Sequence, residues 1–261
     1  MLELINIHKT FNKGTVNERK ALSDLNLHLD KGDFVTIIGS NGAGKSTMFN
    51  AIGGSYIADT GKIILDGEDI TFKKEYKRSR QIGRLFQDPL KGTAPSMTIE
   101  ENLMLAHMRS IKGSIFKRPD TAFYTEKLSH LDMGLEDRMK TKVGTLSGGQ
   151  RQAITLLMAT ISSPKLLLLD EHTAALDPAT AEKVIKLTEI ITKENTITTL
   201  MITHNIKSAL EIGNRTIMMN AGKVILDIKG DERKQMTVEK LLMLFKEKSS
   251  TELDNDRIIL S

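Results

Sequence analysis

The chain contains no cysteine among its 261 residues. This absence excludes disulfide bonds, thiolate metal sites and cysteine nucleophiles. Long apolar segments are also missing, since the leucine run at residues 166–169 is far too short to cross a bilayer. The first residues, Met1-Leu2-Glu3-Leu4, lack the charged and then apolar layout of a signal peptide. We therefore expect a protein without a membrane span or a secretion signal.

A strong excess of one charge is missing as well. The chain has 37 basic and 33 acidic residues and a net charge of +4. The two signs are interleaved except at residues 73–78, and such a stretch is more typical of a solvated surface than of a nucleic-acid site. No nucleic-acid partner is expected. With 39% hydrophobic and 27% charged residues, the chain resembles an average globular protein. Its length suits one sizeable α/β domain with an inserted subdomain.

Runs typical of strands alternate with helical periodicity, except at residues 90–143, where the pattern becomes mainly helical. This stretch predicts an all-α insertion between two halves of an α/β core. Thr98 with Glu101, and Ser147 with Gln150, have the spacing of capping boxes. We expect strands at 2–8, 25–29, 33–38, 62–66, 81–86, 166–170, 197–203, 215–220 and 223–227. Helices are expected at 45–52, 98–108, 121–131, 147–160, 177–193 and 238–245, with another ending near 212 and a loop at 113–120.

The strongest local signal is Gly39-Ser40-Asn41-Gly42-Ala43-Gly44-Lys45-Ser46-Thr47. It matches G-x-x-x-x-G-K-S/T, follows a strand and opens a helix, which is the context that the motif requires. Its glycines let backbone N–H groups surround phosphate oxygens. Lys45 would contact the β- and γ-phosphates, and the Ser46 hydroxyl would bind Mg²⁺. A plain glycine-rich turn is the alternative, but average composition produces this pattern in roughly 1% of such chains, which favours the phosphate site.

A buried strand ends in two carboxylates, Asp170 and Glu171. Four leucines precede them and would hold the strand tip rigidly in a parallel sheet. Asp170 is then expected to hold the Mg²⁺ shell, and Glu171 to polarise a water for attack on the γ-phosphate. Taken alone, a strand ending in Asp-Glu is commonplace. Together with the phosphate loop it indicates nucleotide hydrolysis.

The sequence Leu146-Ser147-Gly148-Gly149-Gln150 matches the LSGGQ signature of ABC ATPases. Other motifs of that family follow in order, so residues 2–227 resemble an ABC ATPase. The resemblance makes Gln87 the Q-loop glutamine, Ala175-Leu176-Asp177 the D-loop and His204 the switch histidine. It also makes Phe11 the aromatic that stacks on adenine, although a loop aromatic packed on the core is the alternative.

The resemblance implies an α/β fold: a RecA-like P-loop NTPase core with an antiparallel β-subdomain and an inserted α-helical subdomain. Expected boundaries are 1–89 and 145–228 for the core, 90–144 for the insertion and 229–261 for a C-terminal helix and tail. The implied cofactors are ATP and Mg²⁺, with Ser46, Gln87 and Asp170 at the metal. Glu171, His204 and Gln87 would act in catalysis. Nucleotide contacts would come from Phe11, from residues 39–47, from Ser147, Gly148, Gly149 and Gln150, and from Asp177.

The same family resemblance implies partners. A second ATPase subunit would complete each site, because the family sandwiches ATP between the P-loop of one subunit and the signature of the other. A separate permease, an extracytoplasmic solute-binding protein and a peripheral position on the cytoplasmic face of the plasma membrane are also implied. The expected function is import of a small solute such as an amino acid. An exporter ATPase, a soluble non-transport ABC protein and a non-hydrolysing cassette are the alternatives. The single cassette, the lack of a heptad run and the intact Lys45 and Glu171 argue against the last two.

One position departs from the family pattern. His172 stands where most members have proline, giving Asp-Glu-His-Thr. We interpret this histidine as a local packing variant rather than a second base. Together with Gly92-Thr93-Ala94-Pro95, the motif resembles a branch of bacterial importer ATPases, some of which are linked to uptake of tryptophan or related amino acids.

Overall fold

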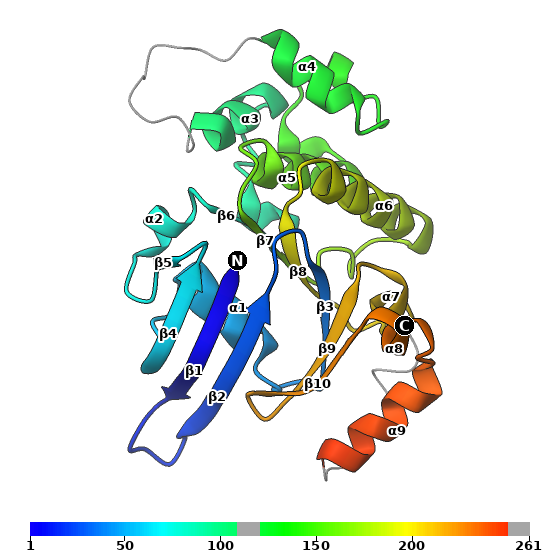
Figure 1. Ribbon diagram of the computed structural model, residues 1–261. Helices are drawn as coiled ribbons and strands as arrows, with labels where there is room; N and C mark the ends of the chain where they lie inside the picture. Colours follow the sequence, from blue (N-terminus) through cyan, green and yellow to red (C-terminus); the bar gives the residue numbers. More distant parts are fainter. Residues whose placement is uncertain (109–120, 250–261) are drawn as a thin grey trace. The chain divides into compact units, whose positions relative to one another are not determined.

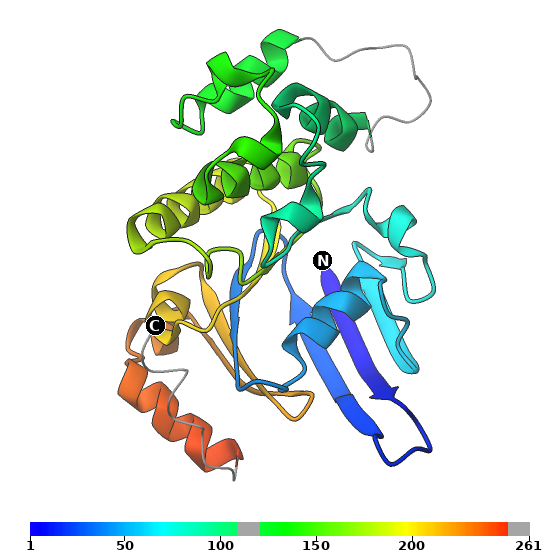
Figure 2. The ribbon, with the colours of Figure 1, turned by 180° about the vertical axis from the view of Figure 1, so that it is seen from behind.

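The computed structural model describes residues 1–108 and 121–249 (Figures 1 and 2). Its contacts divide the chain into two compact units. Residues Met1–Arg78 with Thr198–Ser261 form what we call the terminal unit, and Ser79–Ile197 form the central unit. The domain boundaries expected from the motifs stay a prediction. The loop expected at 113–120 and the tail from residue 250 lie outside the described residues.

The terminal unit contains an antiparallel sheet in the order β2-β1-β4-β5. Its strands are β1 (Leu2–Phe11), β2 (Arg19–Leu29), β4 (Thr60–Leu65) and β5 (Glu68–Asp69). Leu2 lies opposite both Leu29 and Leu65, so buried leucines stack across three strands. This confirms the expected β-subdomain. β2 begins six residues earlier than predicted, because two consecutive buried residues, Ala21 and Leu22, and the left-handed Asp24 (φ 54°) interrupt the alternation before Leu25.

A parallel arrangement surrounds β3 (Phe34–Ile38) in the same unit. This strand pairs with β8 (Thr198–Ile202) and β9 (Arg215–Asn220), and all residues of β3 and β8 are buried. Strand β9 continues into β10 (Lys223–Lys229) through Ala221 and Gly222, whose φ angles are 46° and 78°. Two left-handed residues are what a tight two-residue hairpin turn requires. The predicted hairpin is therefore confirmed.

The helices of the terminal unit cover its sheets. They are α1 (Lys45–Gly53), α2 (Glu75–Arg78), α7 (Ile206–Glu211), α8 (Gly230–Lys234) and α9 (Val238–Ser249). Figure 2 shows α1 lying against the antiparallel sheet. Helix α1 is capped at its C-terminus by Gly54, which has a left-handed backbone (φ 91°). Helix α9 buries Leu241 and Phe245 in a cluster with residues of β9 and β10, and it runs four residues beyond its predicted end.

The central unit pairs two parallel strands, β6 (Ile82–Leu85) and β7 (Leu166–Asp170). Its helices are α3 (Ile99–Met108), α4 (Thr121–Ser129), α5 (Gly148–Thr160) and α6 (Pro178–Glu194), with 3₁₀ turns η1 (Pro89–Gly92), η2 (Glu136–Arg138) and η3 (Val143–Thr145). Both predicted capping boxes are present at the starts of α3 and α5. Among the described residues, none of the helices is long and apolar enough to cross a membrane.

Candidate nucleotide site

The loop between β3 and α1 is shaped by glycines that tolerate no side chain. A Cβ added to Gly39 would lie 2.3 Å from the carbonyl oxygen of Met219, and one added to Gly44 would lie 2.6 Å from that of Ala21. Gly44 also has a φ angle of 102°, which L-residues rarely adopt. The backbone therefore folds here as a phosphate-binding loop does, and the loop leads directly into the start of a helix.

The β9–β10 turn holds this loop from one side. The N–H of Gly222 donates to the carbonyl oxygen of Ala43 at 2.9 Å, and the N–H of Ser23 donates to that of Gly222 at 3.2 Å. The turn thus bridges β2 and the loop. Two backbone hydrogen bonds and the glycine contacts fix the loop in place before any ligand arrives.

Lys45 lies inside this loop. Its side chain is buried, and its Nζ donates to the carbonyl oxygens of Gly39 at 2.6 Å and Ser40 at 3.1 Å. Ser46, the next residue, is exposed at the first turn of α1. An ammonium group beside a helix N-terminus attracts phosphate oxygens. The structure therefore brings together the two side chains that the motif singled out.

Sequence reasoning missed Arg19, which also reaches the loop. Its Nη2 donates to the carbonyl oxygen of Gly42 at 3.2 Å. Arg19 opens β2 and pairs across the sheet with Phe11. Only the strand register places this guanidinium beside the loop, so no local pattern could have indicated it. The contact adds a second cation to the site.

Phe11 ends β1 and is half-buried. Its ring lies edge-on to Tyr56, with centroids 5.2 Å apart, and the Nζ of Lys9 stands 5.7 Å from its centroid. No pattern in the sequence indicates that Tyr56 is its partner. Two neighbouring rings that remain partly exposed offer an apolar surface on which a base can stack.

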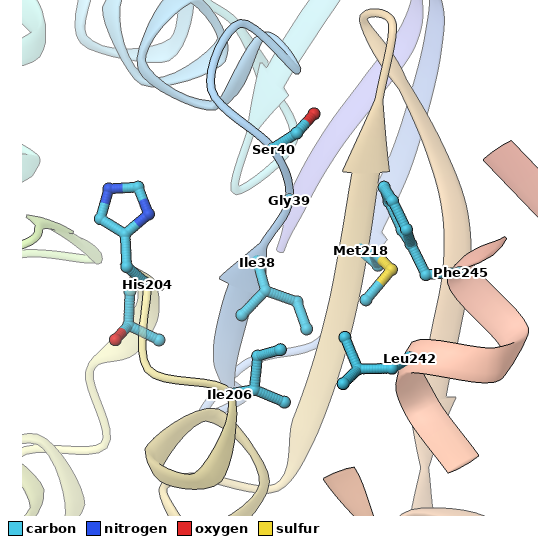
Figure 3. Close-up of a pocket in the computed structure, with 9 residues that line it drawn as sticks. Ile38, Gly39, Ser40, His204, Ile206, Met218, Leu242 and Phe245 are labelled. Carbon is cyan, nitrogen blue, oxygen red and sulfur yellow. The ribbon is translucent and has the colours of Figure 1, made fainter. Parts of the chain in front are cut away.

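His204 follows β8 in the terminal unit. The N–H of Thr203 donates to the carbonyl oxygen of Ile37 at 3.1 Å, so the chain still runs beside β3 just before the histidine. Figure 3 shows a pocket next to Gly39 whose apolar wall includes Leu242 and Phe245 of α9. The His204 ring points away from these two side chains. The pocket is apolar and unsuited to phosphate. His204 and the phosphate loop follow the carboxyl ends of the parallel strands β8 and β3, at the same end of the sheet.

In the central unit, the two carboxylates lie at the end of β7, where Asp170 is the last residue of the strand and Glu171 follows it. Leu166 to Leu169 are fully buried, while Asp170 and Glu171 are half-buried. Glu171 has a φ angle of 47°, a left-handed conformation that costs a non-glycine residue about 1–2 kcal/mol. Its carbonyl oxygen accepts from the N–H of Ala174 at 3.0 Å. The chain therefore turns sharply at the residue predicted to act as general base, and this strain was not predictable from the sequence.

His172 is 2% exposed and packs beneath α6. Its Nε2 lies 3.4 Å from the hydroxyl oxygen of Thr188. Burial lowers the pKa of His172 to about 4, because a charged ring would lose its hydration. The ring is thus neutral at pH 7, which agrees with its interpretation as a packing residue.

The signature forms the first turn of α5. The N–H of Gln150 donates to Ser147 Oγ, and the N–H of Ser147 donates to Gln150 Oε1, both at 3.3 Å. Ser147 and Gly148 are exposed, whereas Gly149 is buried. An exposed serine and glycine at a helix N-terminus can receive an anion from outside the unit.

Gly149 packs directly on α6, which leads to a stability prediction. A Cβ at this position would lie 2.2 Å from Thr180 Cγ2. Glycine to alanine normally stabilises a helix by about 0.5–1 kcal/mol. Here we expect Gly149→Ala to destabilise the protein by about 1–3 kcal/mol, because the β-branched threonine has little freedom to move.

Urea unfolding of Gly149→Ala alone and combined with Thr180→Ser measures this effect. Serine lacks Cγ2, so the double variant should recover most of the lost stability. A single variant as stable as the wild type would show that the two helices separate easily.

The remaining predicted residues occupy loop and cap positions. Gln87 is exposed two residues after β6, and Asp88 caps η1 by accepting from the N–H of Leu90 at 2.9 Å. Asp177 caps α6, and hydrogen bonds from Thr180 lower its pKa. The D-loop also contacts the signature, since a Cβ on Gly148 would lie 3.2 Å from Leu176. The central unit thus contains the signature, the D-loop and the two carboxylates.

Comparison with known proteins agrees with this geometry. The ABC transporter family model matches residues 22–174, which include the phosphate loop, the signature and both carboxylates. The chain belongs to the ABC transporter family. It is the ATP-hydrolysing subunit of such a transporter, and the expected RecA-like fold with its two subdomains is confirmed.

Individual ABC relatives align over most of the chain. A tyrosine transport ATP-binding protein of Clostridioides difficile is 45% identical over 247 residues, covering 94% of this chain and 98% of the relative. A methionine import ATP-binding protein of Pseudomonas entomophila is 36% identical and covers 86% and 66%. A dimeric ATP-binding cassette solved in a post-hydrolysis state with ADP and Pi superposes with a TM-score of 0.75 at 31% identity, covering 88% of this chain and 98% of that one.

Proposed function

We propose that this ABC ATPase powers the import of an aromatic amino acid. The observation that carries the proposal is the 45% identity, over almost the full length of both chains, to a tyrosine transport ATP-binding protein. The Asp-Glu-His-Thr motif around His172 supports the same class of solute, because it resembles importers linked to tryptophan or related amino acids.

In the proposed reaction, each side chain acts on ATP or on the attacking water. Lys45 and the N–H groups of the glycine loop hold the β- and γ-phosphates, and Phe11 stacks on adenine. Glu171 accepts a proton from the water as it attacks the γ-phosphate in line. His204 contacts the γ-phosphate. Gln87 couples the presence of the γ-phosphate to the position of the helical insertion. The preformed loop around Lys45 supports this assignment, because positioning dominates phosphoryl transfer.

Ser46, Asp170 and Gln87 would hold Mg²⁺. Hydroxyl, carboxylate and amide oxygens are the hard ligands that this ion prefers, and no thiolate competes because cysteine is absent. When bound, Mg²⁺ neutralises charge on the phosphate oxygens. The exposed Ser46 at the first turn of α1 fits such a role.

Two copies of the chain would pair head to tail. Ser147 and Gly148 are exposed at the start of α5, where they can bind the ATP held by the P-loop of another copy. Asp177 would then face the same interface. A related cassette has been solved as a dimer, which supports this arrangement.

The pair would bind a permease at the cytoplasmic face of the plasma membrane, with an extracytoplasmic protein delivering the solute. Leu90, Leu105 and Met108 support a docking role for the helical insertion, because these apolar side chains are 41%, 45% and 40% exposed. Permease co-purification that survived deletion of the insertion would contradict this role.

Transport in vesicles tests the proposal. Purified chain and its permease, reconstituted with the solute-binding protein, should accumulate labelled tyrosine or tryptophan in an ATP-dependent manner. Excess unlabelled aromatic amino acid should abolish uptake, while unlabelled methionine or phosphonate should not. Uptake of another solute class alone would overturn the aromatic assignment, and outward movement would overturn import.

A further inference from the structure

His172 follows the predicted general base, Glu171, in the chain, and its side chain contacts helix α6. Glu171 and His172 are adjacent, yet their environments differ, since Glu171 is half-buried and His172 is enclosed. The left-handed backbone of Glu171 is an unfavourable state for glutamate. Such a conformation persists only where its surroundings fix it. The neighbour that is anchored in the interior is His172.

The direction of the His172 hydrogen bond follows from its partner. Thr188 Oγ1 donates its only hydrogen to the carbonyl oxygen of Val184, at 2.8 Å. Its oxygen can therefore only accept from His172, so Nε2 carries the hydrogen and donates. The opposite nitrogen, Nδ1, is buried and has no hydrogen-bond partner among residues 1–108 and 121–249. The ring is accordingly held from one side, through Nε2 to α6.

We infer that His172 is a positioning residue for the Glu171 carboxylate. Where proline would restrict the backbone covalently, this chain fixes the turn after β7 by tying the next side chain to Thr188 of α6. The anchor resists relaxation of the Glu171 backbone and keeps the carboxylate aimed at the attacking water. The inference rests on the proposed role of Glu171.

Matched substitutions separate positioning from packing. A glutamine at 172 can place its Nε2 near the original donor, whereas an asparagine is too short to reach Thr188. We expect His172→Gln to keep kcat within about threefold of the wild type, and His172→Asn to lower it about tenfold. The KM for ATP should stay within twofold in both, because the phosphate loop is untouched.

Thr188→Val removes the acceptor and should lower kcat as His172→Asn does. Thr192→Val is its control, since Thr192 is buried on the same helix and its hydroxyl donates to the carbonyl oxygen of Thr188, not to the His172 ring. This control should leave kcat unchanged. ATP hydrolysis by the full chain and thermal melting are measured for every variant.

Each outcome decides the inference. A loss confined to kcat in His172→Asn and Thr188→Val supports it. Equal rates in the glutamine and asparagine variants, or a kcat loss in Thr192→Val as large as in Thr188→Val, would overturn it as merely structural. Normal hydrolysis by Glu171→Gln would instead overturn the proposed general base, and the inference with it.

Discussion

Replacement of Glu171 by glutamine is expected to lower the rate of ATP hydrolysis at least a hundredfold. General-base catalysis contributes about 10²–10⁴-fold, and an amide cannot accept the proton of the attacking water. The side chain keeps its size, so ATP binding should persist. Because hydrolysis releases the paired subunits in the proposed cycle, the variant should accumulate as an ATP-bound dimer.

Phosphate release and size-exclusion chromatography in MgATP measure the two effects. Glu182→Gln is a matched control, because Glu182 lies exposed on α6 in an ion pair with Lys186. It should hydrolyse ATP at the wild-type rate and remain in the wild-type equilibrium between monomer and dimer. A Glu171→Gln protein that hydrolyses ATP normally would assign the base elsewhere.

Replacement of Arg78 by methionine should destabilise the protein by about 3 kcal/mol or more. Arg78 is 1% exposed and donates to four carbonyl oxygens, those of Ala51, Ile52, Thr71 and Lys73, at 2.7–2.9 Å. The first two belong to the last turn of α1, so the guanidinium caps the helix that begins at Lys45. Methionine would leave these buried acceptors unpaired, at about 1–3 kcal/mol each.

Urea unfolding of Arg78→Met beside Lys77→Met tests this prediction. Lys77 is the exposed neighbour on the same short helix, and its replacement should change stability by less than about 0.5 kcal/mol. Arg78→Lys should recover little, because one ammonium cannot span four acceptors. Equal stability of both methionine variants would show that the α1 carbonyls find other donors.

The elements that the sequence predicted well carry their own local signals. Capping boxes at Thr98 and Ser147 indicate two helix starts, and Asp177-Pro178 indicates a third. Ala221-Gly222 indicates a hairpin turn. Each depends on residues only a few positions apart. Periodicity then supplied the strands between them. For the same reason, most candidate residues could be placed at the end of a strand or the start of a helix.

Features that the sequence did not predict arise from contacts between distant positions. Arg19 reaches Gly42 only through strand register, and the four acceptors of Arg78 come from two separate segments. The burial of His172 depends on its contact with α6, in which Thr188 lies sixteen residues further on. The strained backbone of Glu171 has no residue-type signal at all. The helix and strand propensities of residues depend on near neighbours in the sequence, so they cannot indicate contacts between distant positions.

The bridge between Gly222 and Ala43 has a consequence for how the protein is made. Strand β3 needs β8 and β9 on its two sides, and the loop after it needs the turn at Gly222. A ribosome therefore synthesises the whole central unit before the first ATP-binding segment can complete its pairing. Closing so long a stretch of chain is slow. Until β8 and β9 are made, the nascent β3 must wait with both of its edges unpaired, which makes this the stage of synthesis most exposed to aggregation.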